Sequence, residues 1–189
     1  RIYEEYTGLP VDADYELILA SLIPPGTDVL ANTIAYEKSF RITTVVDAMR
    51  VENDAPVLES WNLRWPIWHE LGHTTLEGEL DRYPERVAAL EARTLTPRCS
   101  FPTWQRCIRE HVAMGIADRL WEWARENGRE TRGDSPDRDT RETDGMHQLS
   151  AIKKALKEYE SDRKRYPTLR EFYPRLLEPF SESAGAPRK

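Results

Sequence analysis

Cysteine is scarce in this sequence of 189 residues, which contains only Cys99 and Cys107. Two cysteines are too few for a disulfide-based scaffold, and they are not spaced as the C-x-x-C of a zinc ribbon or a thioredoxin-like motif. Two interpretations of the pair stay open. The cysteines close a small loop through a disulfide bond if the protein is exported, or they are two ordinary buried thiols.

Long hydrophobic runs are missing as well, because no apolar stretch of the sequence approaches the ~18 residues that a membrane span requires. Positive charge is in the minority: 27 Lys and Arg residues stand against 33 Asp and Glu residues, for a formal net charge of -6. An acidic chain is poorly suited to binding the phosphate backbone of nucleic acids. We therefore expect neither a membrane span nor a nucleic-acid partner.

The length of the chain favours one domain with a substantial core. We assign residues 1–180 to this single domain. The stretch 128–145 contains no apolar side chain and predicts a charged loop insertion. Residues 181–189 predict a flexible tail.

The order of the expected elements predicts the fold class. Residues 1–14 are polar and predict an irregular lead-in. Apolar and β-branched residues then predict strands at 15–24, 32–40 and 41–51. Helical spacing of apolar residues predicts helices at 61–80, 82–95, 103–128, 146–166 and 168–180. Strands followed by helices are typical of an α+β domain, here with a small N-terminal β-sheet.

The segment HELGH at 69–73 carries the motif H-E-x-x-H, in a chain with only four histidines. On a helix, residues four apart lie on one face, so His69 and His73 can bind one metal ion together. Imidazole nitrogens suit zinc, whose catalytic sites keep one position for water. Glu70 lies about 100° further around the helix, where it can take a proton from that water. The uncharged flanks favour a buried helix over a chance match at the surface.

A catalytic zinc site usually takes a third ligand from the protein. The metzincin pattern would place this ligand at Glu79, but Leu76 stands where that pattern needs glycine. Glu110 is the better candidate, because it is a carboxylate on an otherwise apolar stripe of the helix at 103–128. Small residues near it would let the motif helix approach closely.

These small residues are Ala113, Gly115 and Ala117. The alternative for Glu110 is that it caps the start of its helix or pairs with a neighbouring arginine, Arg106 or Arg109.

Three stretches, WHELGHTTL at 68–76, REHVAMGIADRL at 109–120 and YESDRKRYPTLREFYPRLL at 159–177, together resemble the DUF4932 family of bacterial zinc peptidase-like proteins. The likeness covers residues 15–180. It implies a zincin-like fold in which a small N-terminal sheet precedes the motif helix. It also implies one zinc ion in a gluzincin-like set of ligands, which are His69, His73 and Glu110, with Glu70 as the catalytic base.

The resemblance draws attention to His111 as a second catalytic residue. The chain departs from the family pattern at Arg109, where asparagine is expected, and at Leu71, where phenylalanine is expected. Neither departure removes a residue of the metal site. The charged insertion at 128–145 is a further departure, and it bears on access to the site.

A zinc peptidase also needs a group that stabilises the oxyanion. The chemically able candidates are Tyr36, His111, Arg119 and His147. His111 either faces the cleft or donates a hydrogen bond to a backbone carbonyl. Arg119 projects away from Glu110, which favours a surface role.

Two further features lie near the motif. Asp118 could accept a hydrogen bond from a metal-bound histidine, although an exposed salt bridge is the interpretation that we favour. The tryptophans before the motif, among them Trp65 and Trp68, could line a substrate cleft. Their helical spacing favours core packing instead.

The sequence therefore predicts a zinc-dependent hydrolase, a metallopeptidase acting on peptide or protein substrates. One alternative is a zinc amidohydrolase acting on a non-peptide amide. Another is a non-catalytic binding or scaffold protein that keeps the zinc, and Glu70 argues against it because a structural site needs no base. By analogy with the family we expect an extracytoplasmic or secreted bacterial protein, and the sequence, which begins at Arg1, carries no information on a signal peptide.

Overall fold

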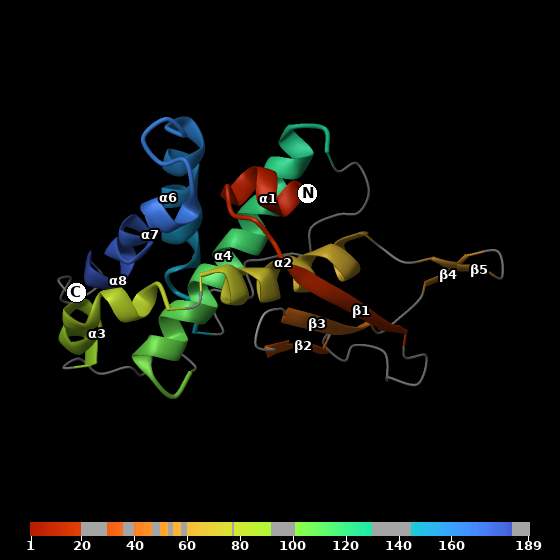
Figure 1. Cartoon of the computed structure of the whole chain (residues 1–189), viewed down its shortest axis with the longest axis horizontal. Coiled ribbons are helices and arrows are strands. Elements are labelled where there is room, and N and C mark those ends of the chain that lie inside the picture. Colours follow the sequence, from red (N-terminus) through yellow and green to blue (C-terminus); the bar gives the residue numbers. More distant parts are fainter. Residues whose placement is uncertain are drawn as a thin grey trace, which may run out of the picture.

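The computed structural model of the chain (Figure 1) describes residues 1–12, 64–76, 78–91, 101–129 and 145–181 with their side chains. It describes the backbone alone of residues 13–19, 30–35, 40–46, 50–52, 55–57, 60–63 and 182. Helices dominate the first group of residues, and they gather around α4 (Trp104–Glu126).

The central helix α4 is buried on nearly every side. Thr103 caps its start, where the side-chain oxygen accepts a hydrogen bond from the amide of Arg106 at 3.2 Å. Buried residues then continue along the helix to Ala124 without keeping to one stripe. A helix whose buried residues lie on nearly every side belongs in the interior, so neighbouring elements must cover it.

The most extensive helix contacts of α4 in the described part of the chain are with α1 (Ile2–Thr7), α2 (Ser60–Thr75), α3 (Pro84–Glu91) and α6 (Leu149–Ser161). The remaining described helices are the 3-10 helix η1 (Leu80–Arg82), α7 (Leu169–Leu176) and α8 (Glu178–Glu182). Each of the five helical segments expected from the sequence contains an observed helix. Their apolar faces form one hydrophobic core.

The first helix, α1, was not expected, because the polar composition of residues 1–14 predicts an irregular lead-in. Buried residues nevertheless recur every third position: Tyr3, Tyr6 and Leu9 are all less than 5% exposed. The Tyr159 hydroxyl donates a hydrogen bond to the Tyr6 carbonyl at 2.9 Å. Gly8 ends α1 with a φ of 66°, a conformation that glycine adopts without strain.

Helices α2 and α4 come unusually close at Gly72, inside the motif. A Cβ atom at this position would lie 3.1 Å from the Cα atom of Ala113. The expectation that small residues on α4 allow close approach is therefore confirmed at Ala113. Because Gly72 adds no bulk, side chains from the same face of α2 reach the surface of α4.

Five strands are traced by their backbone: β1 (Ala13–Leu19), β2 (Leu30–Ala35), β3 (Phe40–Val46), β4 (Arg50–Glu52) and β5 (Ala55–Val57). In the larger sheet, β3 lies between β1, to which it is parallel, and β2, to which it is antiparallel. β4 and β5 form an antiparallel pair.

The predicted α+β class, a zincin-like fold built on an N-terminal sheet, is wrong. The residues whose side chains are described are 73% helical and include no strand. Their core is made by α1 and by the helices that follow residue 60. Strand propensity at 15–51 reflects local backbone preference, whereas fold class depends on which elements share the core. A core helix already enclosed by helices needs no sheet to cover it.

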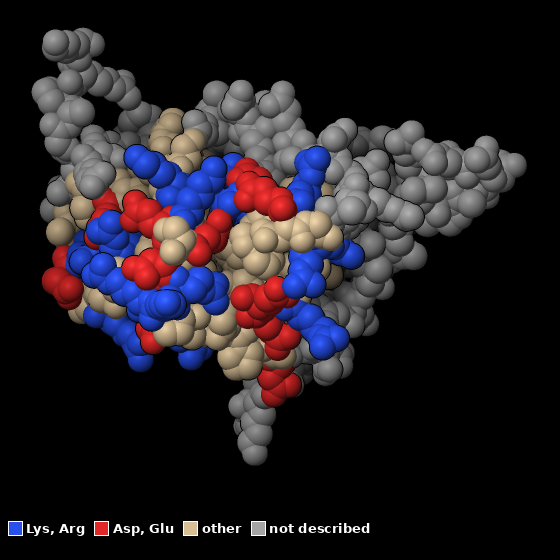
Figure 2. Space-filling view, turned by 90° about the horizontal axis from the view of Figure 1, so that it is seen from above, with Lys and Arg blue, Asp and Glu red and all other residues tan. Residues whose placement is uncertain are grey.

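Surface charge in the described part is mixed in sign. Figure 2 shows Lys and Arg side chains interspersed with Asp and Glu on one face, without a broad field of one sign. Among the described helices, none combines the length and the apolar character that crossing a membrane demands.

Two predicted segments fall mostly beyond the described residues. Residues 130–144 of the charged insertion at 128–145 lie outside the described residues. Residues 183–189 of the tail at 181–189 lie outside them as well.

Arg119 on α4 is the buried centre of an ionic network that reaches α6 directly and α1 through Glu160. Its side chain is only 3% exposed, and its guanidinium donates to Glu160 on α6 at 2.7 Å and to Glu126 at 2.6 Å. The Tyr6 hydroxyl on α1 donates to Glu160 as well, at 2.9 Å. The surface role expected for Arg119 is wrong, because α4 is enclosed also on the side that faces away from Glu110.

Replacing Arg119 with Leu is expected to lower the free energy of unfolding by about 3 kcal/mol, because Glu160, which is only 15% exposed, then loses its charged partner. Urea denaturation followed by circular dichroism measures the loss. Arg125→Leu is the matched control on the same helix, since Arg125 is exposed. Equal losses for the two variants would show that the network contributes nothing to stability.

Candidate metal centre

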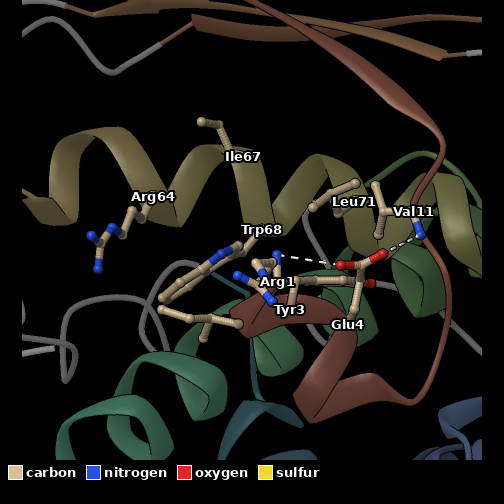
Figure 3. A pocket seen from close by; sticks show the side chains of 9 residues that line it. Arg1, Tyr3, Glu4, Val11, Arg64, Ile67, Trp68 and Leu71 are labelled. Carbon is tan, nitrogen blue, oxygen red and sulfur yellow. Dashed lines mark hydrogen bonds and ion pairs between the residues drawn. The ribbon is translucent and has the colours of Figure 1, made fainter. Parts of the chain in front are cut away.

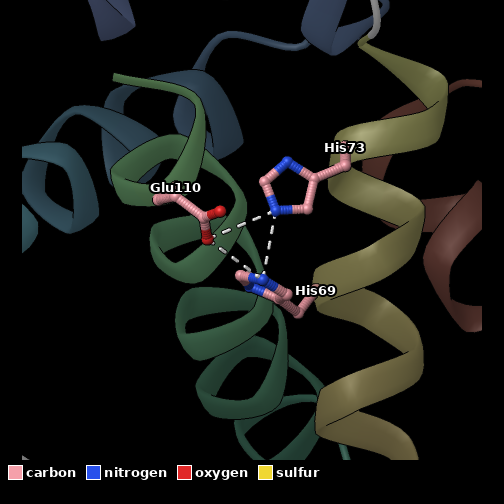
Figure 4. A group of neighbouring side chains, drawn as sticks. All are labelled: His69, His73 and Glu110. Carbon is pink, nitrogen blue, oxygen red and sulfur yellow. Dashed lines mark hydrogen bonds and ion pairs between the residues drawn. The ribbon is translucent and has the colours of Figure 1, made fainter. Parts of the chain in front are cut away.

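Three side chains from two helices converge beside the close approach of α2 and α4 (Figure 4). His69 and His73 extend from α2, and Glu110 extends toward them from α4. The two Nε2 atoms are 3.1 Å apart. The Glu110 Oε2 atom lies 3.5 Å from each of them. These residues form the cluster of possible metal ligands found among the described residues.

The spacing of these three atoms suits zinc. Bonds of about 2.0–2.1 Å from a tetrahedral zinc ion place its ligand atoms about 3.3 Å apart. The observed edges of 3.1, 3.5 and 3.5 Å match one face of such a tetrahedron. The side chain of His73 is 26% exposed, against 12% for His69. The open side of the cluster is therefore nearer to His73.

Glu110 is held as a carboxylate at this position. Burial alone would raise the pKa of Glu110, but its hydrogen bonds and electrostatic attraction to His69 and His73 bring that pKa well below its ordinary value. The other carboxylate oxygen, Oε1, lies 3.7 Å from the Nε atom of Arg106. The two oxygens thus face different partners, and Oε2 is the one that faces the histidines.

A family model with the description "Domain of unknown function (DUF4932)" matches residues 2–178. The chain belongs to the DUF4932 family. No curated protein and no solved structure matches the chain. The resemblance seen in the three sequence islands is thereby confirmed as family membership, and the peptidase activity that it implied stays a prediction.

Glu79, the other possible third ligand in this DUF4932 domain, points elsewhere. It is 5% exposed and forms ion pairs with Arg82 at 3.0 Å and with Arg170 at 3.4 Å. Two arginines already neutralise this carboxylate. It is therefore a structural partner of the helices that follow α2, and it is absent from the His69, His73 and Glu110 cluster.

Glu70 follows His69 directly on α2 and is partly buried. Its backbone carbonyl accepts a hydrogen bond from the Thr74 hydroxyl at 2.9 Å. By the helical step of about 100° per residue, the Glu70 side chain leaves the helix beside the cluster and not through it. This is the placement that the motif predicts for a base.

His111 lies in the core of the DUF4932 domain, fully buried. Its Nδ1 atom is 2.7 Å from the carbonyl oxygen of Cys107, to which a protonated Nδ1 donates. Its ring meets that of Phe180 edge to face, with centroids 5.5 Å apart. Burial lowers the pKa of His111. His111 was expected either to face the cleft or to donate a hydrogen bond to a backbone carbonyl. The structure shows the hydrogen bond to the carbonyl of Cys107. The catalytic role of His111 stays a prediction.

Cys107 carries a disulfide bond. The other cysteine of the sequence, Cys99, lies outside the described residues.

Of the remaining candidates for stabilising the oxyanion, Tyr36 lies outside the described residues, and His147 is exposed. Arg119 belongs to the network with Glu160 and is not part of the cluster.

Asp118 and Trp65 are the residues whose place sequence reasoning missed. Asp118 was expected in an exposed salt bridge, but it is fully buried and accepts a hydrogen bond from the Trp65 indole nitrogen at 2.7 Å. Trp65 in turn stacks on His69. The i, i+4 spacing of Trp65 and His69 was the available signal, because such pairs meet on a helix.

A pocket of about 390 Å³ lies between α1 and α2 (Figure 3). Its lining includes Arg64, Ile67, Trp68 and Leu71 from α2. By the helical step, these residues project from the opposite side of α2 to His69 and His73. The pocket is therefore separate from the candidate metal centre. Trp68 is 5% exposed and packs on Trp121 of α4, as expected for a core residue.

Proposed function

We propose that this DUF4932 domain is a zinc-dependent hydrolase, a metallopeptidase that cleaves peptide or protein substrates. The proposal rests above all on the triangle formed by His69 Nε2, His73 Nε2 and Glu110 Oε2, with edges of 3.1, 3.5 and 3.5 Å. Three protein ligands leave one tetrahedral position for water or substrate. This count is typical of catalytic zinc sites, whereas structural sites use four protein ligands.

Zinc bound here would supply a Lewis acid that polarises the substrate carbonyl and acidifies water. The chain's own contribution is the charge of the ligand set. Two neutral imidazoles and one carboxylate carry a single negative charge, so the site keeps a net positive charge around a divalent ion. That charge favours the oxyanion that develops during attack on an amide.

Glu70 provides the general base in this proposal. Its carboxylate takes a proton from the attacking water and later delivers that proton to the leaving amine nitrogen. Both transfers need a carboxylate that is beside the ligands but is not itself a ligand. The position directly after His69 on α2 meets this requirement.

Removal of the metal is the experiment that tests the proposed activity. Zinc-loaded wild-type protein is expected to cleave members of a mixture of peptides of varied sequence, with products identified by mass spectrometry. Treatment with 1,10-phenanthroline is expected to reduce cleavage to the level of the buffer blank, because the ligand set then holds no Lewis acid. Added zinc is expected to restore cleavage.

The matched control is His73→Ala protein, purified and supplied with zinc in the same way. It shows whether a contaminating peptidase produces the cleavage. Equal cleavage by the variant, or cleavage that persists in the chelator, contradicts the proposal. Complete absence of cleavage by zinc-loaded wild type rules out a general peptidase.

A further inference from the structure

Trp65 lies against one of the candidate zinc ligands. It precedes His69 by one helical turn on α2, so the two side chains share a face. Their rings are nearly parallel, with an interplanar angle of 16° and centroids 5.3 Å apart. His69 and His73 meet differently, edge to face at 88°. The indole therefore covers a flat face of the His69 ring, while His73 lies at its edge.

The indole is itself held from the opposite helix. The Nε1–H group of Trp65 donates a hydrogen bond of 2.7 Å to the Oδ1 atom of Asp118 on α4. Asp118 is fully buried. A hydrogen bond to a buried carboxylate is short and strong, and its directionality fixes the plane of the donor ring. The orientation of Trp65 is thus set by α4, the helix that also carries Glu110.

His69 needs such support from outside its own ring. A metal-binding histidine is usually oriented by an acceptor on its second ring nitrogen. The Nδ1 atom of His69 is buried, and no side chain or backbone group among the described residues forms a hydrogen bond with it. The stacked indole is a contact that restricts rotation of the His69 ring. That ring orientation directs Nε2 toward Glu110 Oε2, 3.5 Å away.

We propose that Trp65 and Asp118 form a positioning pair for His69. Trp65 holds the imidazole plane by stacking, and Asp118 holds the indole in that orientation through the hydrogen bond from Nε1. The inference rests on the proposed zinc site and adds two residues to it. Neither residue touches the metal or the substrate, so both are positioning residues and not catalytic ones.

A double-mutant cycle on zinc affinity tests the pair. Zinc dissociation constants are measured by competition with a chromophoric chelator for wild type, Trp65→Leu, Asp118→Ala and the double variant. Each single substitution is expected to weaken zinc binding by roughly 10–100-fold, the usual effect of removing an outer support of a ligand. The double variant is expected to bind zinc as Trp65→Leu does, because Asp118 has no effect once the indole is gone.

Conservative variants separate positioning from general damage to the fold. Asp118→Asn retains an acceptor oxygen and is expected to restore most of the affinity that Asp118→Ala loses. Trp65→Phe retains a stacking ring without the N–H donor, so its affinity is expected to be insensitive to a second substitution at Asp118. The visible absorption of bound Co²⁺ reports the ligand geometry, and it is expected to change in Trp65→Leu but not in Asp118→Asn.

Trp68→Leu is the matched control, because Trp68 is a more deeply buried tryptophan of the same helix that packs on Trp121. It is expected to lower the melting temperature and to leave zinc affinity within about 2-fold of wild type.

Equal loss of affinity in Trp65→Leu and Trp68→Leu overturns the proposal, and so does wild-type affinity in Trp65→Leu. In both cases the zinc site itself stands. Independent, additive losses in the double variant overturn the role of Asp118. A wild type that binds no zinc removes the proposed function and, with it, this inference.

Discussion

Replacing Glu70 with Gln is expected to lower kcat for peptide cleavage by roughly 10²–10⁴-fold, the usual contribution of a general base. Glutamine has the size of glutamate but cannot take a proton from water. The substitution leaves His69, His73 and Glu110 in place, so zinc content is expected to be unchanged. Initial rates on a cleaved peptide, together with elemental analysis of the same preparation, measure the two quantities.

Glu85→Gln is the control for loss of a carboxylate elsewhere, since Glu85 is exposed in the first turn of α3. Its cleavage rate is expected to equal that of wild type. A Glu70→Gln enzyme that retains its metal and works within a few-fold of wild type contradicts the assignment of Glu70 as the base. A variant that loses both metal and activity shows instead that Glu70 supports the ligands.

The geometry of the candidate site could be predicted from the sequence because helical spacing is a strong constraint. Two histidines four positions apart must share a face of α2, and a carboxylate on an apolar stripe of α4 must face another element. Small residues on α4 indicated the close approach that is seen at Gly72 and Ala113. The expected grouping of His69, His73 and Glu110 follows from these local rules.

The rest of the site could not be predicted, because helical projection does not reveal how many sides of a helix are covered. Arg119 projects away from Glu110 and Asp118 lies about 80° from it around the helix, and for a helix with one buried face these directions favour solvent. α4 is enclosed on those sides too, so both residues are buried and paired. The same enclosure explains why the predicted fold class was wrong. Strand propensity in the first third of the chain does not show which elements share the core with α4.

The position of Trp65 illustrates a second gap. Helical spacing indicated that it faces inward, and its partial burial agrees with this. Spacing alone does not distinguish a core tryptophan such as Trp68 from one that contacts a candidate metal ligand. The distinction depends on the partner across the helix interface, Asp118 for Trp65 and Trp121 for Trp68.

Loss of zinc from Glu110→Gln is the second large effect that we expect. An amide oxygen is a much weaker ligand for zinc than a carboxylate, and two histidines alone leave the ion with too few protein ligands. Glu79→Gln is the matched control, because Glu79 is also a buried glutamate near α2 but pairs with Arg82 and Arg170. It is expected to retain its zinc.

The most direct test of the zinc site is the zinc content of the purified protein, measured by elemental analysis after dialysis against a buffer with trace zinc. We predict about one zinc ion per chain for wild type and for Glu79→Gln, and less than about a tenth of that for His73→Ala and Glu110→Gln. Wild-type protein that takes up no zinc, or Glu110→Gln protein that holds zinc as tightly as wild type, would contradict a site built from His69, His73 and Glu110.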